Sequence, residues 1–159
     1  MKVLLITPPF TAKERYGKLA AVGTLYPPLG LAYIASIGEK EGHDVKVIES
    51  EAHGYSFEDI YNQVAKFKPD LIGMPTFLNT IQRCFAVADE VRKRFMGIKI
   101  VLGGVHVTLN PDEAINKESV DFVVIGEGEL VFQGLLKALE GKISLENVLS
   151  KIGFLRPSI

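Results

Sequence analysis

Residues 2–7 read Lys2-Val3-Leu4-Leu5-Ile6-Thr7 and are followed at once by Pro8 and Pro9. A short, almost wholly apolar run that stops at prolines is typical of a parallel strand covered on both faces. Similar runs recur at 70–74, 99–103 and 121–125. A fifth run, at 44–49, alternates apolar and polar residues, which suits a strand at the edge of a sheet. The sequence therefore predicts five strands.

Helical patterns separate these runs. Leu29, Ala32 and Ala35 recur at one-turn spacing, with Ile34 and Ile37 beside them, and Gly42 follows as a stop signal. Ser56 and Asp59 have the spacing of a capping box at the start of a second helix. Further helices are expected at about 80–94, from Pro111 with Asn110 as its cap, and at about 129–139. A short helix at 145–149 follows.

Strands that alternate with helices of this length predict an α/β fold. We expect a doubly wound, parallel, five-stranded sheet of flavodoxin-like order 2-1-3-4-5, with helices on both faces. The chain has 159 residues, which is the size of one domain.

Composition excludes several classes of protein. The net charge is -1, which argues against a nucleic-acid-coating protein and against a polybasic membrane binder. No secretory signal and no run long enough for a membrane helix is visible, so we expect a cytoplasmic protein without a membrane span. Cys84 is the single cysteine. It excludes an internal disulfide, a four-cysteine zinc site, and an iron–sulfur cluster ligated by three or four cysteines of this chain alone.

Ligands of such sheets bind at the carboxyl ends of the strands, so the loops there are the informative segments. Pro8 and Pro9 have no N–H group to offer a phosphate, and no Gly-x-Gly-x-x-Gly fingerprint follows the first strand. The long stretch up to Tyr26 is interpreted as a solvated loop, with the alternative that Lys13, Arg15 and Lys18 meet an anionic ligand.

The remaining loops offer binding groups and no obvious catalytic set or metal-ligand spacing. Gly103 and Gly104 permit close approach of a flat ligand or form a structural turn. His106 is interpreted as a hydrogen-bonding residue rather than a metal ligand. Glu127 and Glu129 either complement the positive end of the last helix or accept ligand amide N–H groups. Thr76 and Asn79 are candidate helix caps or hydrogen-bond donors, and Glu49 ends the second strand.

Four stretches in order resemble a known family, namely PPLGLAY at 27–33, GHDV at 42–45, LGGVH at 102–106 and DFVVIGEGE at 121–129. They are similar to the N-terminal cobalamin-binding domain of radical S-adenosylmethionine enzymes. That group includes methyltransferases and anaerobic magnesium-protoporphyrin monomethyl ester cyclases. The resemblance covers residues 2–142.

The resemblance implies that cobalamin binds across the carboxyl ends of the strands. It implies that Gly103 and Gly104 lie where the nucleotide tail passes the sheet, and that 75–77 meet that tail. The Asp-x-His-x-x-Gly motif, which supplies a lower histidine ligand in other cobalamin domains, is missing after the first strand. We therefore expect cobalamin without that histidine. The candidate cofactor-binding residues are Thr7, Pro8, Pro9, Pro75, Thr76, Phe77, Gly103, Gly104, Val105, His106, Gly126, Glu127 and Gly128.

The family's catalytic barrel carries a three-cysteine motif that a chain with one cysteine cannot supply. The expectation is a cobalamin-binding domain at 1–142 and an extension at 143–159 that leads toward a missing catalytic domain. S-adenosylmethionine and a 4Fe-4S cluster would belong to that radical S-adenosylmethionine barrel, in the same polypeptide or complex. This chain alone would not be catalytic, and its parent would be a methyltransferase or cyclase. The alternatives are a cofactor-free docking or regulatory domain of the same fold and a flavin-binding domain, which would co-purify with FMN.

Overall fold

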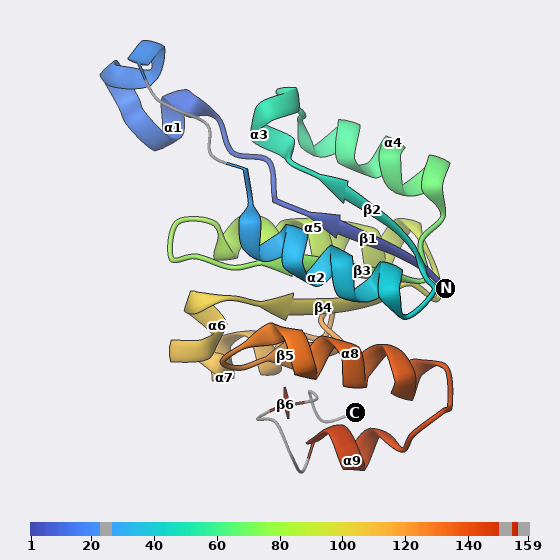
Figure 1. Cartoon of the computed structure of the whole chain (residues 1–159). Helices are drawn as coiled ribbons and strands as arrows, with labels where there is room; N and C mark the ends of the chain where they lie inside the picture. The colour runs from blue at the N-terminus through green and yellow to red at the C-terminus, as the bar shows by residue number, and fades with distance from the viewer. Residues whose placement is uncertain (23–26, 150–153, 156–159) are drawn as a thin grey trace.

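The computed structural model describes residues 1–22, 27–149 and 154–155. Its core is a parallel sheet in the order β2-β1-β3-β4-β5 (Figure 1), so the predicted order 2-1-3-4-5 is confirmed. A sixth strand, which the sequence did not predict, extends the sheet beyond β5. The strands are β1 (Lys2–Ile6), β2 (Asp44–Ile48), β3 (Leu71–Pro75), β4 (Lys99–Gly103), β5 (Phe122–Val124) and β6 (Phe154–Leu155).

Burial explains why these runs form strands. Four of the five residues of β1 and of β3 are buried, as expected for strands with helices on both sides. Only one of the five residues of β2 is buried, which fits its place at the edge of the sheet. Each parallel pair keeps its register, from Lys2 opposite Asp44 to Pro75 opposite Gly103. All five carboxyl ends therefore meet at one edge of the sheet.

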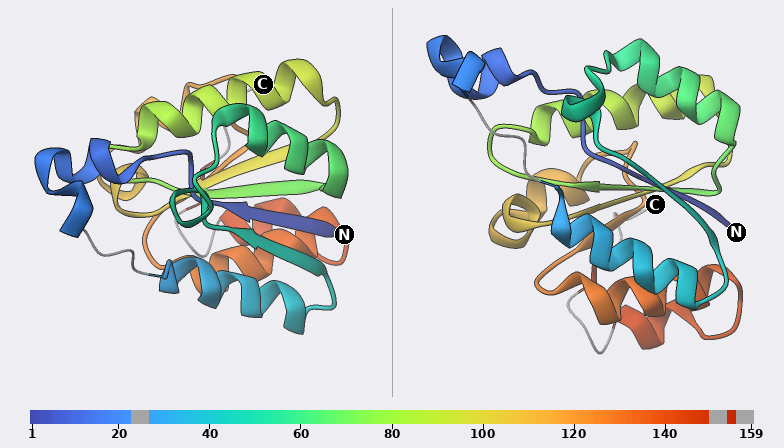
Figure 2. Two further views of the ribbon diagram at one scale, coloured as in Figure 1. Left: turned by 90° about the horizontal axis from the view of Figure 1, so that it is seen from above. Right: turned by 45° about the horizontal axis from the view of Figure 1, so that its top comes forward.

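Helices cover both faces of the sheet (Figure 2). On one face lie α4 and α5, and on the other lie α2 and α8. The helices, including one 3-10 helix, are α1 (Ala12–Tyr16), η1 (Gly17–Val22), α2 (Leu29–Lys40), α3 (Ser50–His53), α4 (Phe57–Phe67), α5 (Ile81–Arg94), α6 (Val105–Leu109), α7 (Pro111–Ile115), α8 (Gly128–Leu139) and α9 (Leu145–Leu149).

The cap signals had mixed outcomes. The capping box is confirmed, since the Ser56 side chain accepts from the Asp59 N–H and the Asp59 carboxylate accepts from the Ser56 N–H. The Asn110 side chain makes no capping hydrogen bond to α7.

The buried side of α2 consists of Leu31, Ala35 and Gly38. Of the residues that recur at one-turn spacing in this helix, Ala35 is buried, whereas Leu29 and Ala32 are exposed.

The stretch after β1 differs from the solvated loop that we expected. It forms α1 and η1, which project beyond the carboxyl edge of the sheet (Figures 1 and 2). Thr11 and Glu14 form a reciprocal capping box that starts α1. Two further short helices, α3 and α6, were also not predicted.

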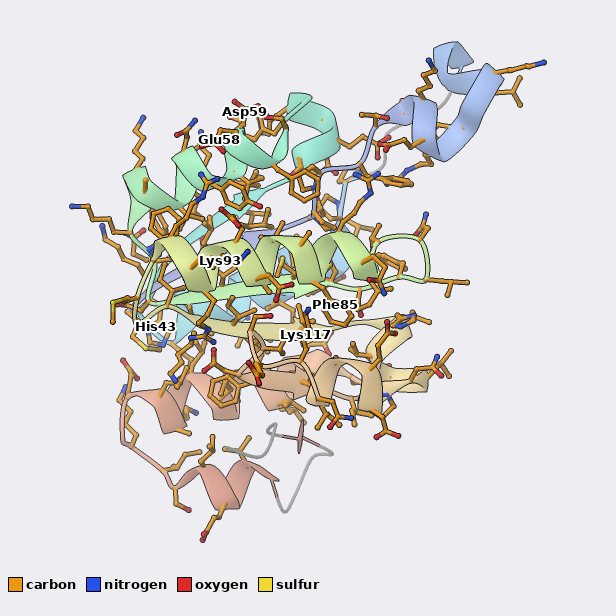
Figure 3. All side chains as sticks on the ribbon, turned by 180° about the vertical axis from the view of Figure 1, so that it is seen from behind. His43, Glu58, Asp59, Phe85, Lys93 and Lys117 are labelled. Carbon is orange, nitrogen blue, oxygen red and sulfur yellow. The ribbon has the colours of Figure 1, made fainter. Side chains whose placement is uncertain are left out.

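The face that carries α5 is held by packing and surface ion pairs (Figure 3). The Lys117 ammonium lies 5.5 Å from the centre of the Phe85 ring and 2.8 Å from Asp89 Oδ2. Arg94 joins α5 to α4 through Glu58, at 2.8 Å. A hollow of about 370 Å³ lies between α4 and α5, and Tyr61, Glu90 and Arg94 are among its lining residues.

The segment after α8 packs on the domain. Val148 of α9 is buried, and a Cβ placed on Gly134 of α8 would lie 3.1 Å from its Cγ1. The strand β6 pairs antiparallel with β5, with Leu155 opposite Val123. Within the described residues, no helix combines the length and the apolar character needed to cross a membrane.

Candidate functional site

A cavity of about 520 Å³ opens at the carboxyl edge of the sheet, on the side of α2 and α8. Its volume lies in the range of small-molecule and cofactor sites. Residues at or just after the ends of all five parallel strands line it, together with the starts of α2 and α8. Further lining residues come from the segment 8–22, which contains α1 and η1 and is called the α1 arm. The cavity therefore occupies the edge at which doubly wound sheets bind ligands.

The deep wall of the cavity is apolar. Leu5, Val101 and Val124 face it from the sheet, and Ile34 and Phe132 face it from the two helices. Glycines keep this wall open. A Cβ at Gly73 would lie only 2.7 Å from Leu5 Cδ2, and one at Gly128 would lie 3.1 Å from Ile34 Cδ1. Larger residues at these positions would push side chains into the space, so the glycines help to preserve it.

A polar wall stands opposite, between the end of β2 and the α1 arm. Glu49 is the N-cap of α3, where its side chain accepts from the Ala52 N–H, and it accepts at 3.2 Å from Thr7 Oγ1. Glu51 is buried, with 4% of its side chain exposed, and its Oε2 lies 2.6 Å from Arg15 Nη2. Burial raises the pKa of Glu51, Arg15 opposes that rise, and Glu49 adds to it.

The α1 arm is held over this wall by arginines. Arg15 and Arg83 lie 5.5 Å and 5.2 Å from the centre of the Phe10 ring. Arg83 also pairs with Glu14 of α1 and donates to the Pro9 carbonyl at 2.9 Å. Through these contacts the arm connects α3 to α5, and its Phe10 and Arg15 line the cavity.

The turn after β4 is fixed by its neighbour after β3. Thr76 Oγ1 donates to the Gly103 carbonyl at 2.8 Å, and the Thr76 N–H donates to the same carbonyl at 2.7 Å. Gly104 has φ +101°, and a Cβ there would lie 2.9 Å from the Thr76 carbonyl oxygen. Glycine is required at this position both by its backbone angle and by the close approach of the two loops.

The start of α8 brings two more carboxylates to the rim. Glu127 is its N-cap residue but makes no capping hydrogen bond through its side chain, and Glu129 lies in the first turn. Their charge complements the helix dipole, as the sequence indicated. Neither side chain has an ion pair or hydrogen bond among the described residues, so both carboxylates are available to a ligand.

The structure brings most of the candidate residues together. Ten of them line the cavity: Thr7, Pro8, Pro75, Phe77, Gly103, Gly104, Val105, Gly126, Glu127 and Gly128. Pro9, Thr76 and His106 do not. Pro9 binds Arg83, Thr76 is buried beneath the glycine turn, and His106 is buried with its Nε2 2.8 Å from Glu113 Oε2. His106 therefore has the hydrogen-bonding role that the sequence favoured.

Other lining residues were not predicted as part of a site. The main ones are Phe10, Arg15, Leu31, Ile34, Glu51 and Phe132. Arg15 had been noted only as a possible contact for an anion, and its partner in the structure is Glu51. The apolar residues of α2 and α8 lie near the starts of helices that follow strand ends, which is one indication of a site. In the sequence, however, they cannot be distinguished from ordinary core residues.

No catalytic set emerges from this geometry. Cys84 is fully buried, its Sγ lies 3.6 Å from the Pro75 carbonyl oxygen, and burial raises the pKa of its thiol to about 12. It is a core residue. Within residues 1–22, 27–149 and 154–155, no group of three or more His, Cys, Asp or Glu side chains is placed to hold a metal ion. The site can bind and orient a ligand.

The family model described as the B12 binding domain matches residues 17–136. An uncharacterized methyltransferase of Pyrococcus horikoshii, PH0819, is 37% identical over 94% of this chain and 32% of its own length. The anaerobic magnesium-protoporphyrin IX monomethyl ester cyclase of a Synechocystis species is 31% identical over 93% of this chain and 30% of its own length. The chain thus spans about a third of the length of these relatives.

Among solved structures, the chain is similar to the cobalamin-dependent S-adenosylmethionine radical enzyme OxsB with aqua-cobalamin and S-adenosylmethionine bound. The TM-score is 0.77, the identity is 19%, and the match covers 91% of this chain and 19% of OxsB. At that identity the likeness concerns the fold.

Proposed function

The chain belongs to the B12-binding domain family, and we propose that its cavity holds cobalamin with no histidine of this chain on the cobalt. The observation that carries the proposal is the cavity at the carboxyl edge, which combines an apolar wall with a rim of glycines and carboxylates. Cobalamin has an aromatic nucleotide base that suits the apolar wall. Its corrin ring carries amide groups that suit the acceptors of the rim.

The glycines support this fit. A Cβ at Gly30 would meet no atom within 4 Å, so the start of α2 leaves open space beside the cavity. Gly103 and Gly104 bring bare backbone to the rim, where a large flat ligand can approach closely. Ile34, Val124 and Phe132 would hold the apolar part of the cofactor. Bound cobalamin supplies a cobalt centre that can carry a methyl group, and this chain binds and orients it.

The positions of the histidines support the absence of a lower ligand. All three lie in the described part of the chain, and none lines the cavity. His43 is buried at the opposite edge of the sheet, with its Nδ1 3.2 Å from the Met1 amine (Figure 3). His53 is exposed and stacked on Tyr55. His106 is paired with Glu113.

The proposal also includes a partner. Because the relatives named above are about three times longer, we infer that this chain works with a radical S-adenosylmethionine domain of the same polypeptide or complex. That domain would hold S-adenosylmethionine and the 4Fe-4S cluster, and the whole would be a methyltransferase or a cyclase. Residues 1–142 would form the cobalamin-binding domain, and 143–159 would lead toward the partner.

The test is a titration of the purified 159-residue chain with hydroxocobalamin, followed by gel filtration and a visible spectrum of the protein peak. We expect cobalamin to remain with the protein. Electron paramagnetic resonance of the cob(II)alamin form checks the lower ligand, since a histidine nitrogen on cobalt splits the signal into triplets. Loss of all cobalamin on gel filtration at saturating cofactor would overturn the proposal. A split signal that disappears in a histidine variant would overturn its second part.

A second candidate, a cofactor-free docking domain, is favoured by one observation. Exposed apolar side chains lie on the loops and helices that follow the strand ends, which is unusual for a solvated surface. They are Leu29, Phe77, Leu78, Val105, Leu109 and Leu130. A docking domain would bind the radical S-adenosylmethionine barrel without cobalamin, and a pull-down in the presence and absence of cobalamin separates the two functions.

A further inference from the structure

Four carboxylates line the proposed cobalamin cavity against a single cation. They are Glu49, Glu51, Glu127 and Glu129, and the cation is Arg15. The lining is therefore rich in hydrogen-bond acceptors and carries a negative charge. A ligand that fits this wall must present donors and must not present further carboxylates.

Three of these five charged groups already have a partner within the protein, although Glu51 keeps one oxygen, Oε1, without a hydrogen-bond donor. Glu49 accepts from the Ala52 N–H and from Thr7 Oγ1, which fixes the start of α3. Arg15 forms its ion pair with Glu51 and lies over Phe10. Arg15 therefore has a partner before any ligand arrives, and Glu49 has a structural role. The acceptors left for a ligand belong to Glu51, Glu127 and Glu129.

Among these carboxylates, Glu51 gives the strongest indication that a ligand supplies a hydrogen-bond donor to the cavity. Its side chain is 4% exposed, and its Oε1 atom is buried without a hydrogen-bond partner among the described residues. Its contact with Arg15 through Oε2 is an ion pair at 2.6 Å that lacks hydrogen-bond geometry. A buried acceptor without a donor is costly and rare, so a donor from the ligand would satisfy it.

We propose that Glu51, Glu127 and Glu129 select a corrinoid whose peripheral side chains are amides over one whose side chains are carboxylates. The inference rests on the proposed function and adds a specificity to it. An amide NH2 group donates to a carboxylate oxygen, whereas a carboxylate at the same place finds no donor and meets a like charge. In a partly buried wall such repulsion is weakly screened.

The test compares two probes that differ at the periphery of the ring. Dicyanocobinamide carries amides, and dicyanocobyrinic acid carries carboxylates. Both lack the nucleotide, and cyanide fills both axial positions of cobalt, so adventitious histidine ligation contributes to neither. Binding to the 159-residue chain is followed by the change in the visible spectrum at pH 7.5. We expect the amide form to bind at least about tenfold more tightly.

Variants then assign the selectivity to these side chains. The triple variant Glu51→Gln, Glu127→Gln, Glu129→Gln removes the negative charges and is expected to bring the ratio of the two dissociation constants close to one. Glu118→Gln is the matched control for a lost carboxylate, since Glu118 is exposed and lies outside the lining. It should leave the ratio as in the parent chain. Circular dichroism checks that each variant is folded.

The outcomes separate this inference from the proposed function. Equal binding of the two probes, or tighter binding of the acid, overturns the selectivity and leaves cobalamin binding in place. Failure of hydroxocobalamin and of both probes to bind overturns the proposed function. The comparison of the two probes on the unmodified chain needs no variant, so a triple variant that fails to fold does not remove the test.

Discussion

The two faces of the sheet are built differently. The face toward α5 is filled by large side chains, with Leu4, Ile6, Ile72, Ile100 and Leu102 of the strands fully or almost fully buried. The face toward α2 and α8 is filled only in part, because Leu5, Val101 and Val124 of the strands border the cavity.

The helices show the same contrast. The buried side of α5 includes Ile81, Phe85 and Val91, whereas that of α2 is Leu31, Ala35 and Gly38. At Gly38, α2 packs closely on β2, since a Cβ there would lie 2.8 Å from Val45 Cγ2, whereas a Cβ at Gly30 would meet no atom within 4 Å. The face toward α5 thus supplies most of the core packing, whereas the face toward α2 and α8 is less completely packed and contains the binding cavity. The predictions below test this division.

The largest effect is expected from a matched pair in β1. Leu4 faces the filled side and Leu5 lines the cavity, and both are buried. Leu4→Ala should lower the free energy of unfolding by about 4 kcal/mol, and Leu5→Ala by about 2 kcal/mol, because Leu5 borders the cavity whereas Leu4 lies within the filled core. Urea denaturation of both variants measures the difference. Equal losses would mean that the two faces are packed alike.

The second prediction fills the open face. Gly30→Phe places a ring where a Cβ meets no atom within 4 Å, at a position that lines the cavity. Cobalamin affinity should fall by at least about a hundredfold, which is about 2.7 kcal/mol. Ala32→Phe adds the same ring to an exposed site of α2 outside the lining and serves as the control. Retained affinity in Gly30→Phe would place the cofactor elsewhere.

The third prediction concerns two glycines at the edge of the cavity. Gly104 has φ +101° and no room for a Cβ, whereas Gly126 has φ +78° and open space around it. Gly104→Ala should cost about 3 kcal/mol, since it adds a clash with Thr76 to the backbone strain, and Gly126→Ala about 1 kcal/mol. Thermal unfolding of both variants checks the order. A larger loss for Gly126 would contradict the close approach of the loops after β3 and β4.

The filled face was the easier one to predict from the sequence. An almost wholly apolar run such as Val3-Leu4-Leu5-Ile6 predicts that its residues are buried. The helix cap formed by Ser56 and Asp59 is also a local sequence pattern. The strand order followed from the alternation of strands and helices together with the rules for crossovers. Each of these features depends on neighbours in the sequence or on general chirality.

The open face was predicted only at its loops. The glycines and prolines at the strand ends marked the rim, but the pairing of Arg15 with Glu51 joins residues far apart in the sequence and depends on the path of the α1 arm. The spacing of apolar residues did not identify the buried side of α2, because Leu29 and Ala32 share the spacing of the buried Ala35 and are both exposed. A cavity forms where side chains from distant parts of the chain leave space unfilled, and no local sequence pattern predicts that space.

The smallest effect is expected from pH at Glu51. Burial raises the pKa of Glu51 in the folded chain above its ordinary value of 4.5, so the folded state holds the proton more tightly than the unfolded state does. The resulting stability is complete below pH 4.5 and is lost as the pH rises through the folded pKa. Glu51→Gln cannot ionise and should therefore gain on the parent chain as the pH rises across that range. Unfolding curves of both proteins between pH 4.5 and 8, with Glu118→Gln as the charge control, measure this gain. If the stabilities of the two proteins changed with pH in parallel, the ion pair with Arg15 would fully offset the burial of Glu51. The ionised Glu51 would then not destabilise the fold in the absence of a ligand.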